Sequence, residues 1–170
     1  MYPSEHFLIV AVPVVLFTYL CNQRLPSRQL FGVAFLASQF PDLIDKPLAH
    51  VFGLIPSGRV FMHSFPSVFP LWLVVGVYAW RTERSRAGAV FILGHLSHLL
   101  ADNHNALFGS SPRIPDELLW PLVSVPQRPL IPGWAGPGSI NVRLWTLFSA
   151  MVLVVAVYYL AQDVRRQLHS

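Results

Sequence analysis

The stretch Gly94-His95-Leu96-Ser97-His98-Leu99-Leu100-Ala101-Asp102 places two imidazoles and a carboxylate inside an otherwise apolar segment. In a helix each residue turns the chain by about 100°, so these three groups fall within an arc of about 60° on one face. Ionisable side chains are costly to bury among apolar ones, and they usually face a protein-lined cavity. A lone histidine there is more often a hydrogen-bonded core residue. Three groups on one stripe favour a metal site, because His98 and Asp102, four residues apart, can bind one ion together.

The composition indicates a membrane protein. Of the 170 residues 54% are hydrophobic and 12% are charged, about half the charged share of a soluble domain. The net charge of +4 does not indicate nucleic-acid binding, because the basic residues form no single patch with aromatic residues and no nucleic-acid motif is present. Cys21 is the only cysteine, which excludes an internal disulfide and a cysteine zinc site. We expect one membrane-embedded domain over residues 1–170.

Five apolar segments predict an all-α fold, a polytopic membrane helix bundle. They are Phe7–Leu20, Gln29–Phe40, Phe65–Trp80, Ala87–Ala101 and Leu144–Ala161. Only the last is long enough to span a bilayer unaided, since a span needs about 20 apolar residues. No basic region precedes the first segment and no small-residue cleavage site follows it, so we expect a retained helix rather than a signal peptide. The long Pro/Gly-rich connection Asn103–Asn141 is either an interfacial flap or a plain connector.

Charge placement predicts an outer N-terminus and an inner C-terminus, because short cytoplasmic loops carry an excess of Lys and Arg. Seven basic residues share the predicted inner side: Arg24, Arg28, Arg81, Arg84, Arg86, Arg165 and Arg166. The other five fall on the outer side. This orientation brings ligand-type residues of four segments to the outer face: His6, Asp42, Asp45, His63, His98, Asp102 and His104. We therefore expect a site on the extracytoplasmic face of the cell (inner) membrane.

Three further elements contribute to this predicted site. Asp42 and Asp45 end an apolar segment, either as ligands or as solvated carboxylates before a turn at Lys46-Pro47. The run from Arg59 to Ser64 opens the third segment, where a serine is more often an N-cap than a catalytic group. His6 stands before the first segment.

Taken together, these elements resemble the YdjM-like family of membrane-bound, metal-dependent hydrolases (LexA-regulated inner-membrane proteins). The matching residues are His6, Pro41-Asp42, Arg59 through His63-Ser64, Gly94 through His98 and Asp102, Gly109 and Trp120-Pro121-Leu122. Two features depart from the family pattern: Asp45 follows Asp42 by three residues instead of two, and Gly58 stands where the family often has a histidine. The resemblance implies a metal-dependent hydrolase.

The residue types suit a divalent metal, with Zn²⁺ favoured and Mn²⁺ or Fe²⁺ as alternatives. The candidate ligands are His6, Asp42, Asp45, His63, His95, His98 and Asp102. They exceed the needs of one tetrahedral zinc, so either two ions bind or some of these groups orient the others.

The expected reaction is hydrolysis of an ester or phosphodiester by a water that the metal acidifies to a pKa of about 7. Asp45 is the expected general base, and Arg59 is expected to pair with a substrate anion. Ser64 and His104 are candidates for hydrogen bonds to the substrate or leaving group. The membrane setting makes a lipid-like ester the expected substrate.

Two other functions stay open. A metal-ion or proton transporter also uses ionisable residues in membrane helices, although transport sites usually lie near the midplane between inverted repeats. Here the ligands are expected at helix ends, and the sequence shows no repeat. A non-catalytic membrane protein would use a closed metal site for stability. The substrate, the number of ions and the oligomeric state do not follow from the sequence.

Overall fold

The computed structural model describes residues 3–127 and a discontinuous set of positions between 147 and 165. Its helices are α1 (Pro3–Asn22), α2 (Arg28–His50), α3 (Phe65–Arg81), α4 (Ser85–Phe108) and the short 3-10 helix η1 (Asp116–Leu119). The described residues contain no strand, which confirms the all-α prediction. Half of the fifth expected segment, 144–161, lies outside the described residues, and its described positions are helical.

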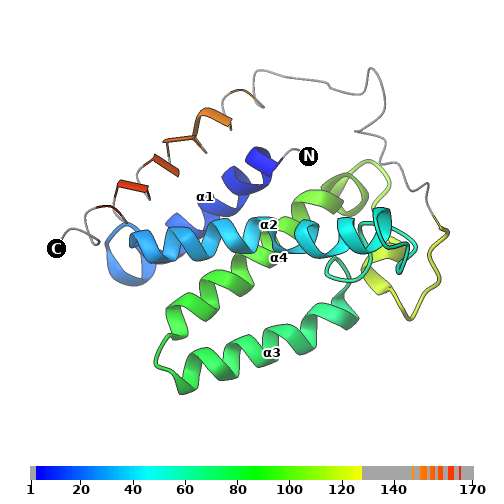
Figure 1. The fold of residues 1–170 in the computed structure, drawn as a ribbon, viewed down its shortest axis with the longest axis horizontal. Coiled ribbons are helices and arrows are strands. Elements are labelled where there is room, and N and C mark those ends of the chain that lie inside the picture. The colour runs from blue at the N-terminus through cyan, green and yellow to red at the C-terminus, as the bar shows by residue number, and fades with distance from the viewer. Residues whose placement is uncertain are drawn as a thin grey trace.

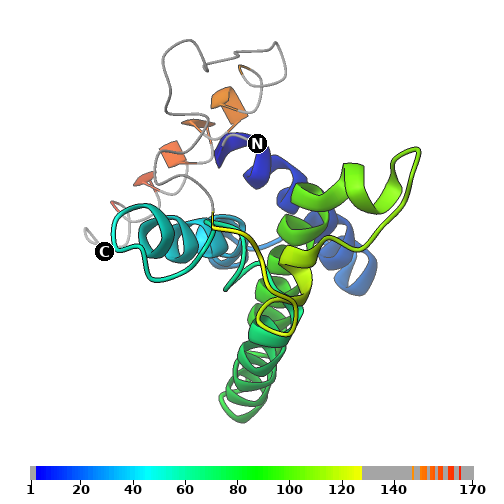
Figure 2. The same ribbon diagram turned by 90° about the vertical axis from the view of Figure 1, so that its right-hand side faces the viewer.

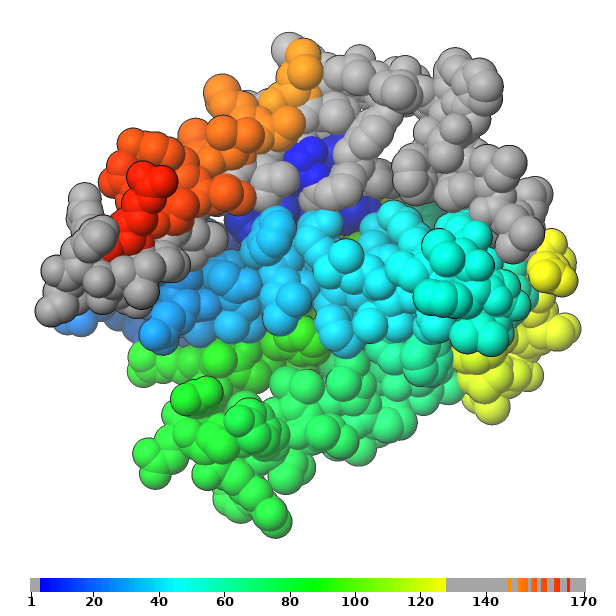
Figure 3. Space-filling model, viewed as in Figure 1, coloured from blue at the N-terminus to red at the C-terminus, as the bar shows by residue number. Residues whose placement is uncertain are grey.

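Helix α4 is the central element of the bundle. It packs against α1, α2 and α3, and α1 also packs against α2. Figure 1 shows α2 crossing α4, and Figure 2 shows α3 and the first half of α4 extending away from α1 and α2. In the space-filling view α2 runs across the front of the molecule with the α3–α4 hairpin below it (Figure 3).

Small side chains allow α1, α2 and α4 to approach one another closely. A fully buried cluster fills the space between these helices: Val10, Val14, Ala34 and Val90. A Cβ atom at Gly94 would lie 2.9 Å from the Cβ of Ala37 and 3.0 Å from Cγ1 of Val10. Glycine is therefore the residue that fits this crossing. The close approach also brings the next turn of α4, which carries His98, against α2.

Helix α2 is longer than the sequence predicts. It continues past Phe40 to His50, so the expected end at Phe40 is wrong, and so is the alternative of a turn at Lys46-Pro47. Prolines inside a helix remove a backbone donor, yet this helix persists because its far half is held by packing and hydrogen bonds. Asp45 is 0% exposed and accepts the Met62 N–H at 2.8 Å, which excludes solvation of this carboxylate at a helix end. Helix α4 likewise continues beyond Ala101 to Phe108.

Helix α1 has the length and apolar composition of a membrane span. Among the described residues, Ser4–Asn22 is the stretch that meets both criteria, with a mean hydropathy of 1.8. Pro13 lies inside this helix, and Thr18 Oγ1 donates to the Val14 carbonyl at 2.8 Å. The helix is longer than the expected segment Phe7–Leu20, so the expectation that this segment is too short to span a bilayer is wrong by length and composition.

Candidate metal centre

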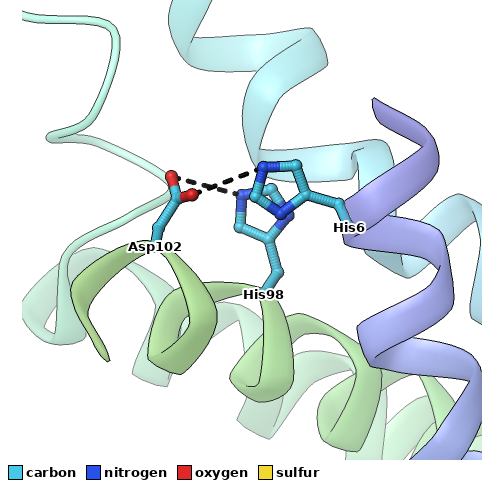
Figure 4. Close-up of side chains that lie close together, drawn as sticks. All are labelled: His6, His98 and Asp102. Atoms are coloured by element: carbon cyan, nitrogen blue, oxygen red, sulfur yellow. Dashed lines mark ion pairs between the residues drawn. The ribbon is translucent and has the colours of Figure 1, made fainter. Parts of the chain in front are cut away.

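Ligand-type side chains from three helices and one turn meet at one point inside the bundle. They are His6 of α1, Asp42 of α2, His63 of the turn before α3, and His98 and Asp102 of α4. They form two triads, each with ligand atoms within 4.8 Å of one another, and both triads include His98. Figure 4 shows the first triad, with His6 reaching from α1 toward His98 and Asp102 on α4. The structure thus brings together five of the seven predicted ligands.

The hydrogen bonds of His63 and His98 define which ring nitrogen of each faces the centre. Nδ1 of His63 lies 2.8 Å from Asp45 Oδ2, and Nδ1 of His98 lies 2.7 Å from the Ser38 carbonyl oxygen. Both partners are acceptors, so each Nδ1 donates to its partner and each Nε2 faces the centre. The two Nε2 atoms lie 3.1 Å apart. This pair of nitrogens is close enough either to share one proton in a hydrogen bond or to bind one cation between them.

Asp102 and His6 add unsatisfied atoms to the same point. Asp102 Oδ1 is buried and has no hydrogen-bond partner among the described residues, and the same holds for His6 Nδ1. Asp102 Oδ1 lies 3.3 Å from His6 Nε2, and the His6 ring stacks on that of His98 with centroids 4.1 Å apart. Buried polar atoms normally have partners. A water molecule or an ion bound at these atoms would satisfy them.

Asp45 lies behind His63 rather than in the centre itself. Its Oδ2 accepts from His63 Nδ1, and its Oδ1 accepts from the Met62 backbone N–H. With both oxygens committed and the side chain 0% exposed, Asp45 is not placed to bind an ion or to take a proton from water. It orients His63, in the manner of carboxylates behind metal-ligating histidines. The predicted ligand and general-base roles of Asp45 are therefore not supported by its contacts.

His95 is also removed from the ligand set by its contacts. Its Nε2 lies 2.9 Å from the Met62 carbonyl oxygen and donates to it, while Trp72 Nε1–H donates to its Nδ1 at 3.3 Å. Both ring nitrogens are thus committed. Because Asp45 accepts the Met62 N–H, the residue directly before His63 is held from both sides. His95 positions the turn that carries His63.

Two cations lie at the rim of the centre, each beside one of its carboxylates. Arg59 Nη2 lies 2.9 Å from Asp102 Oδ2, and Lys46 Nζ lies 2.6 Å from Asp42 Oδ2. The side chains of Arg59 and Lys46 are 42% and 32% exposed, so the centre opens toward the exterior on this side. Three carboxylates against two cations leave a net negative charge, which favours binding of a further cation.

The two remaining predicted residues do not reach the centre. Ser64 is the N-cap residue of α3, and its Oγ donates within the turn, 3.1 Å from the Phe61 carbonyl oxygen and 3.0 Å from Ser67 Oγ. His104 is exposed, and its Nδ1 lies 2.7 Å from the Ala101 carbonyl oxygen. Neither belongs to the groups of ligand atoms found among the described residues.

Comparison with known proteins agrees with this arrangement. Residues 1–167 match the family described as YdjM inner membrane protein. The chain belongs to this family. The predicted resemblance is confirmed, and the chain is accordingly a protein of the inner membrane. No curated protein and no solved structure gives a significant match.

The donor set of this YdjM protein could hold a divalent ion, because imidazole nitrogens and carboxylate oxygens are ordinary ligands of such ions.

Sequence reasoning missed several residues that build the centre. The carbonyl of Ser38 and the indole of Trp72 carry no sequence signal, since their contacts come from other helices. Lys46 did carry one: it follows Asp42 by four residues, the spacing of an ion pair within a helix. It was missed because α2 was expected to end at Phe40.

Proposed function

We propose that this chain is a membrane-bound hydrolase that holds one divalent metal ion among His6, His63, His98 and Asp102, with Asp42 beside it. The observation that carries the proposal is the 3.1 Å separation of Nε2 of His63 from Nε2 of His98, each ring having its Nδ1 proton committed elsewhere. Two imidazole nitrogens this close repel unless a proton or a metal ion lies between them, and the carboxylates around the pair favour the metal ion. Two nitrogens bound to one tetrahedral zinc would lie about 3.3 Å apart, close to the separation seen here.

The shared position of His98 favours one ion over two. His98 belongs to both triads, but its Nδ1 is occupied by the Ser38 carbonyl. It therefore has a single lone pair to offer, on Nε2, and one imidazole nitrogen binds one metal ion. Zinc suits this mixture of imidazole and carboxylate best, with Mn²⁺ and Fe²⁺ as alternatives.

Side chains at the centre and its rim would accept the proton of the water and bind the substrate. A divalent ion supplies Lewis acidity and lowers the pKa of a nearby water. Asp42 has the most exposed of the three carboxylates, 11% against 2% for Asp102 and 0% for Asp45. We assign it the proton of the attacking water, since Asp45 has no oxygen to spare. The half-exposed Arg59 holds an anionic oxygen of the substrate with the part of its guanidinium fork that Asp102 leaves available.

The charge at the rim favours a phosphodiester over a neutral ester. Arg59 and Lys46 both stand beside the opening, and a phosphodiester brings the negative charge that they would neutralise. Because the protein lies in the inner membrane, a lipid-like phosphodiester is the proposed substrate. The arginine-rich loops at the opposite end favour the extracytoplasmic face for the centre.

The first test is the metal content of the detergent-purified chain, measured by elemental mass spectrometry. The wild type should carry about one ion per chain, and His98→Ala should lose it, because this variant removes the ligand common to both triads. His104→Ala is the matched control, since it removes an exposed histidine from the same helix, and it should keep the ion. Equal metal in His98→Ala and wild type, or none in either after reconstitution, would refute the metal centre.

Turnover is tested separately on the metal-loaded protein with bis(p-nitrophenyl) phosphate. Hydrolysis that is lost in His98→Ala and weakened in Arg59→Gln, with the ion retained in Arg59→Gln, would support the proposed reaction. A full complement of metal with no hydrolysis of this phosphodiester or of p-nitrophenyl esters would contradict the hydrolase. The centre would then serve stability or ion transport.

A further inference from the structure

A second charged region lies at the other end of the same helices. The end of α1, the α1–α2 loop, the first turns of α2 and the start of α4 surround an open hollow of about 650 Å³. This volume lies within the range of small-ligand sites. Three arginines line it, Arg24 from the loop and Arg84 and Arg86 from the start of α4. No carboxylate is among the described residues that line it.

The charge of this hollow is not neutralised by the described part of the chain. Arg24, Arg84 and Arg86 are exposed, and no described carboxylate forms an ion pair with any of them. Helix α4 begins here without a side-chain cap, so its partial positive charge adds to that of the arginines. One wall is apolar and includes Leu30 and Val33. The hollow combines unpaired cations with an apolar surface beside them.

We propose that this arginine hollow binds a ligand that carries a negatively charged phosphate group. Guanidinium groups bind phosphate oxygens through paired hydrogen bonds, and basic pockets between membrane helices bind acidic headgroups. Two sources share this chemistry: the headgroup of an acidic phospholipid, with its acyl chain along Leu30 and Val33, and a soluble phosphate ester. The lipid is favoured by the apolar wall.

The arginine hollow is separate from the metal centre. Arg86 and His98 are twelve positions apart in α4, which corresponds to about 18 Å along the helix. The proposal therefore does not depend on whether the centre binds metal or hydrolyses anything, and His98→Ala should bind the phosphate ligand as the wild type does.

The experiment measures binding of phosphatidylglycerol, phosphatidylcholine and sn-glycerol 3-phosphate to the full chain in neutral detergent. The wild type should retain phosphatidylglycerol more tightly than the zwitterionic phosphatidylcholine. Each arginine removed from the hollow should weaken binding about fivefold, so Arg24→Gln loses about fivefold and Arg84→Gln/Arg86→Gln about twentyfold. Arg81→Gln is the matched control, because Arg81 is exposed at the end of α3 and does not line the hollow.

Circular dichroism checks that each variant keeps its helices. Competition by sn-glycerol 3-phosphate at similar concentrations would identify a soluble phosphate ester as the source, and binding of phosphatidylglycerol alone would identify the lipid. If Arg81→Gln weakens binding as much as Arg84→Gln, the effect is one of general surface charge and the proposal is wrong. It is equally wrong if the wild type binds neither anionic ligand more tightly than the double variant.

Discussion

The two ends of the α1–α2–α4 bundle hold charged side chains in opposite ways. At the metal centre the polar groups are buried, and most have a defined partner, as His63 has in Asp45. At the arginine hollow the cations are exposed, and none of the described residues that line it is a carboxylate. Burial is costly for charged groups unless they are paired. Contacts within the protein therefore fix the side chains at the buried end, whereas the positive charge at the exposed end is left for a bound ligand to neutralise.

The largest effect on metal affinity is expected from removing the carboxylate that orients a buried ligand. Asp45→Asn keeps the shape of the side chain but removes the carboxylate that accepts the His63 Nδ1 proton. His63 is then free to carry its proton on Nε2, where it would meet the ion. We expect metal affinity to fall about 10- to 100-fold, measured by competition with a chromophoric chelator.

Asp116→Asn serves as the control for Asp45→Asn, because Asp116 is an exposed carboxylate in η1. It should leave metal affinity unchanged. An Asp45→Asn variant that binds metal as tightly as the wild type would show that the orientation of His63 does not depend on this carboxylate.

A smaller effect, on stability, is expected at the contact of α4 with α1 and α2. Gly94→Ala adds a Cβ atom 2.9 Å from that of Ala37, and such overpacking typically costs about 1–3 kcal/mol. Gly76→Ala, in α3, has nothing within 4 Å of the added atom and should be neutral or slightly stabilising, since alanine favours helices. Thermal unfolding in detergent compares the two variants. Equal melting temperatures would mean that α4 does not need glycine at this crossing.

The least perturbing test locates the two ends relative to the membrane. Cys21 is the only cysteine, it is exposed, and it adjoins Asn22, which lines the arginine hollow. A membrane-impermeant maleimide should therefore label it only after the cells are permeabilised. Ser110→Cys in a Cys21→Ser background places the thiol just beyond the end of α4 and should be labelled in intact spheroplasts. The reverse pattern would put the metal centre on the cytoplasmic side.

The sequence predicts the helices from the length and composition of the apolar segments, and the gathering of ligands from the way these segments alternate across the membrane. His98 and Asp102 lie one helical turn apart, and this relation survives in the structure. The separate roles of His95 and His98 do not follow from spacing, since both lie on the same stripe. His95 meets the Met62 carbonyl and Trp72, whereas His98 meets the Ser38 carbonyl. These partners come from other parts of the chain, and only the packing of α2, α3 and α4 selects them.

The helix boundaries show a second limit. Pro41 and Pro47 are local signals for the end of a helix, and they are overridden because Asp42 and Asp45 are held by distant residues. Because the predicted helix ends at Phe40, the sequence does not predict the ion pair of Lys46 with Asp42, which requires that the helix continue. Tertiary contacts thus decided both the length of α2 and the surroundings of its carboxylates.

The placement of Lys46 also bears on biogenesis. Asp42 and Lys46 belong to one helix and pair across a single turn, so their charges can cancel as soon as α2 forms during synthesis. Asp45 finds its partners, Met62 and His63, further along the chain, and the set is complete only once α4 has been made. The candidate ligands are therefore complete only after α4 has been made, so an ion bound by all of them would enter late in maturation.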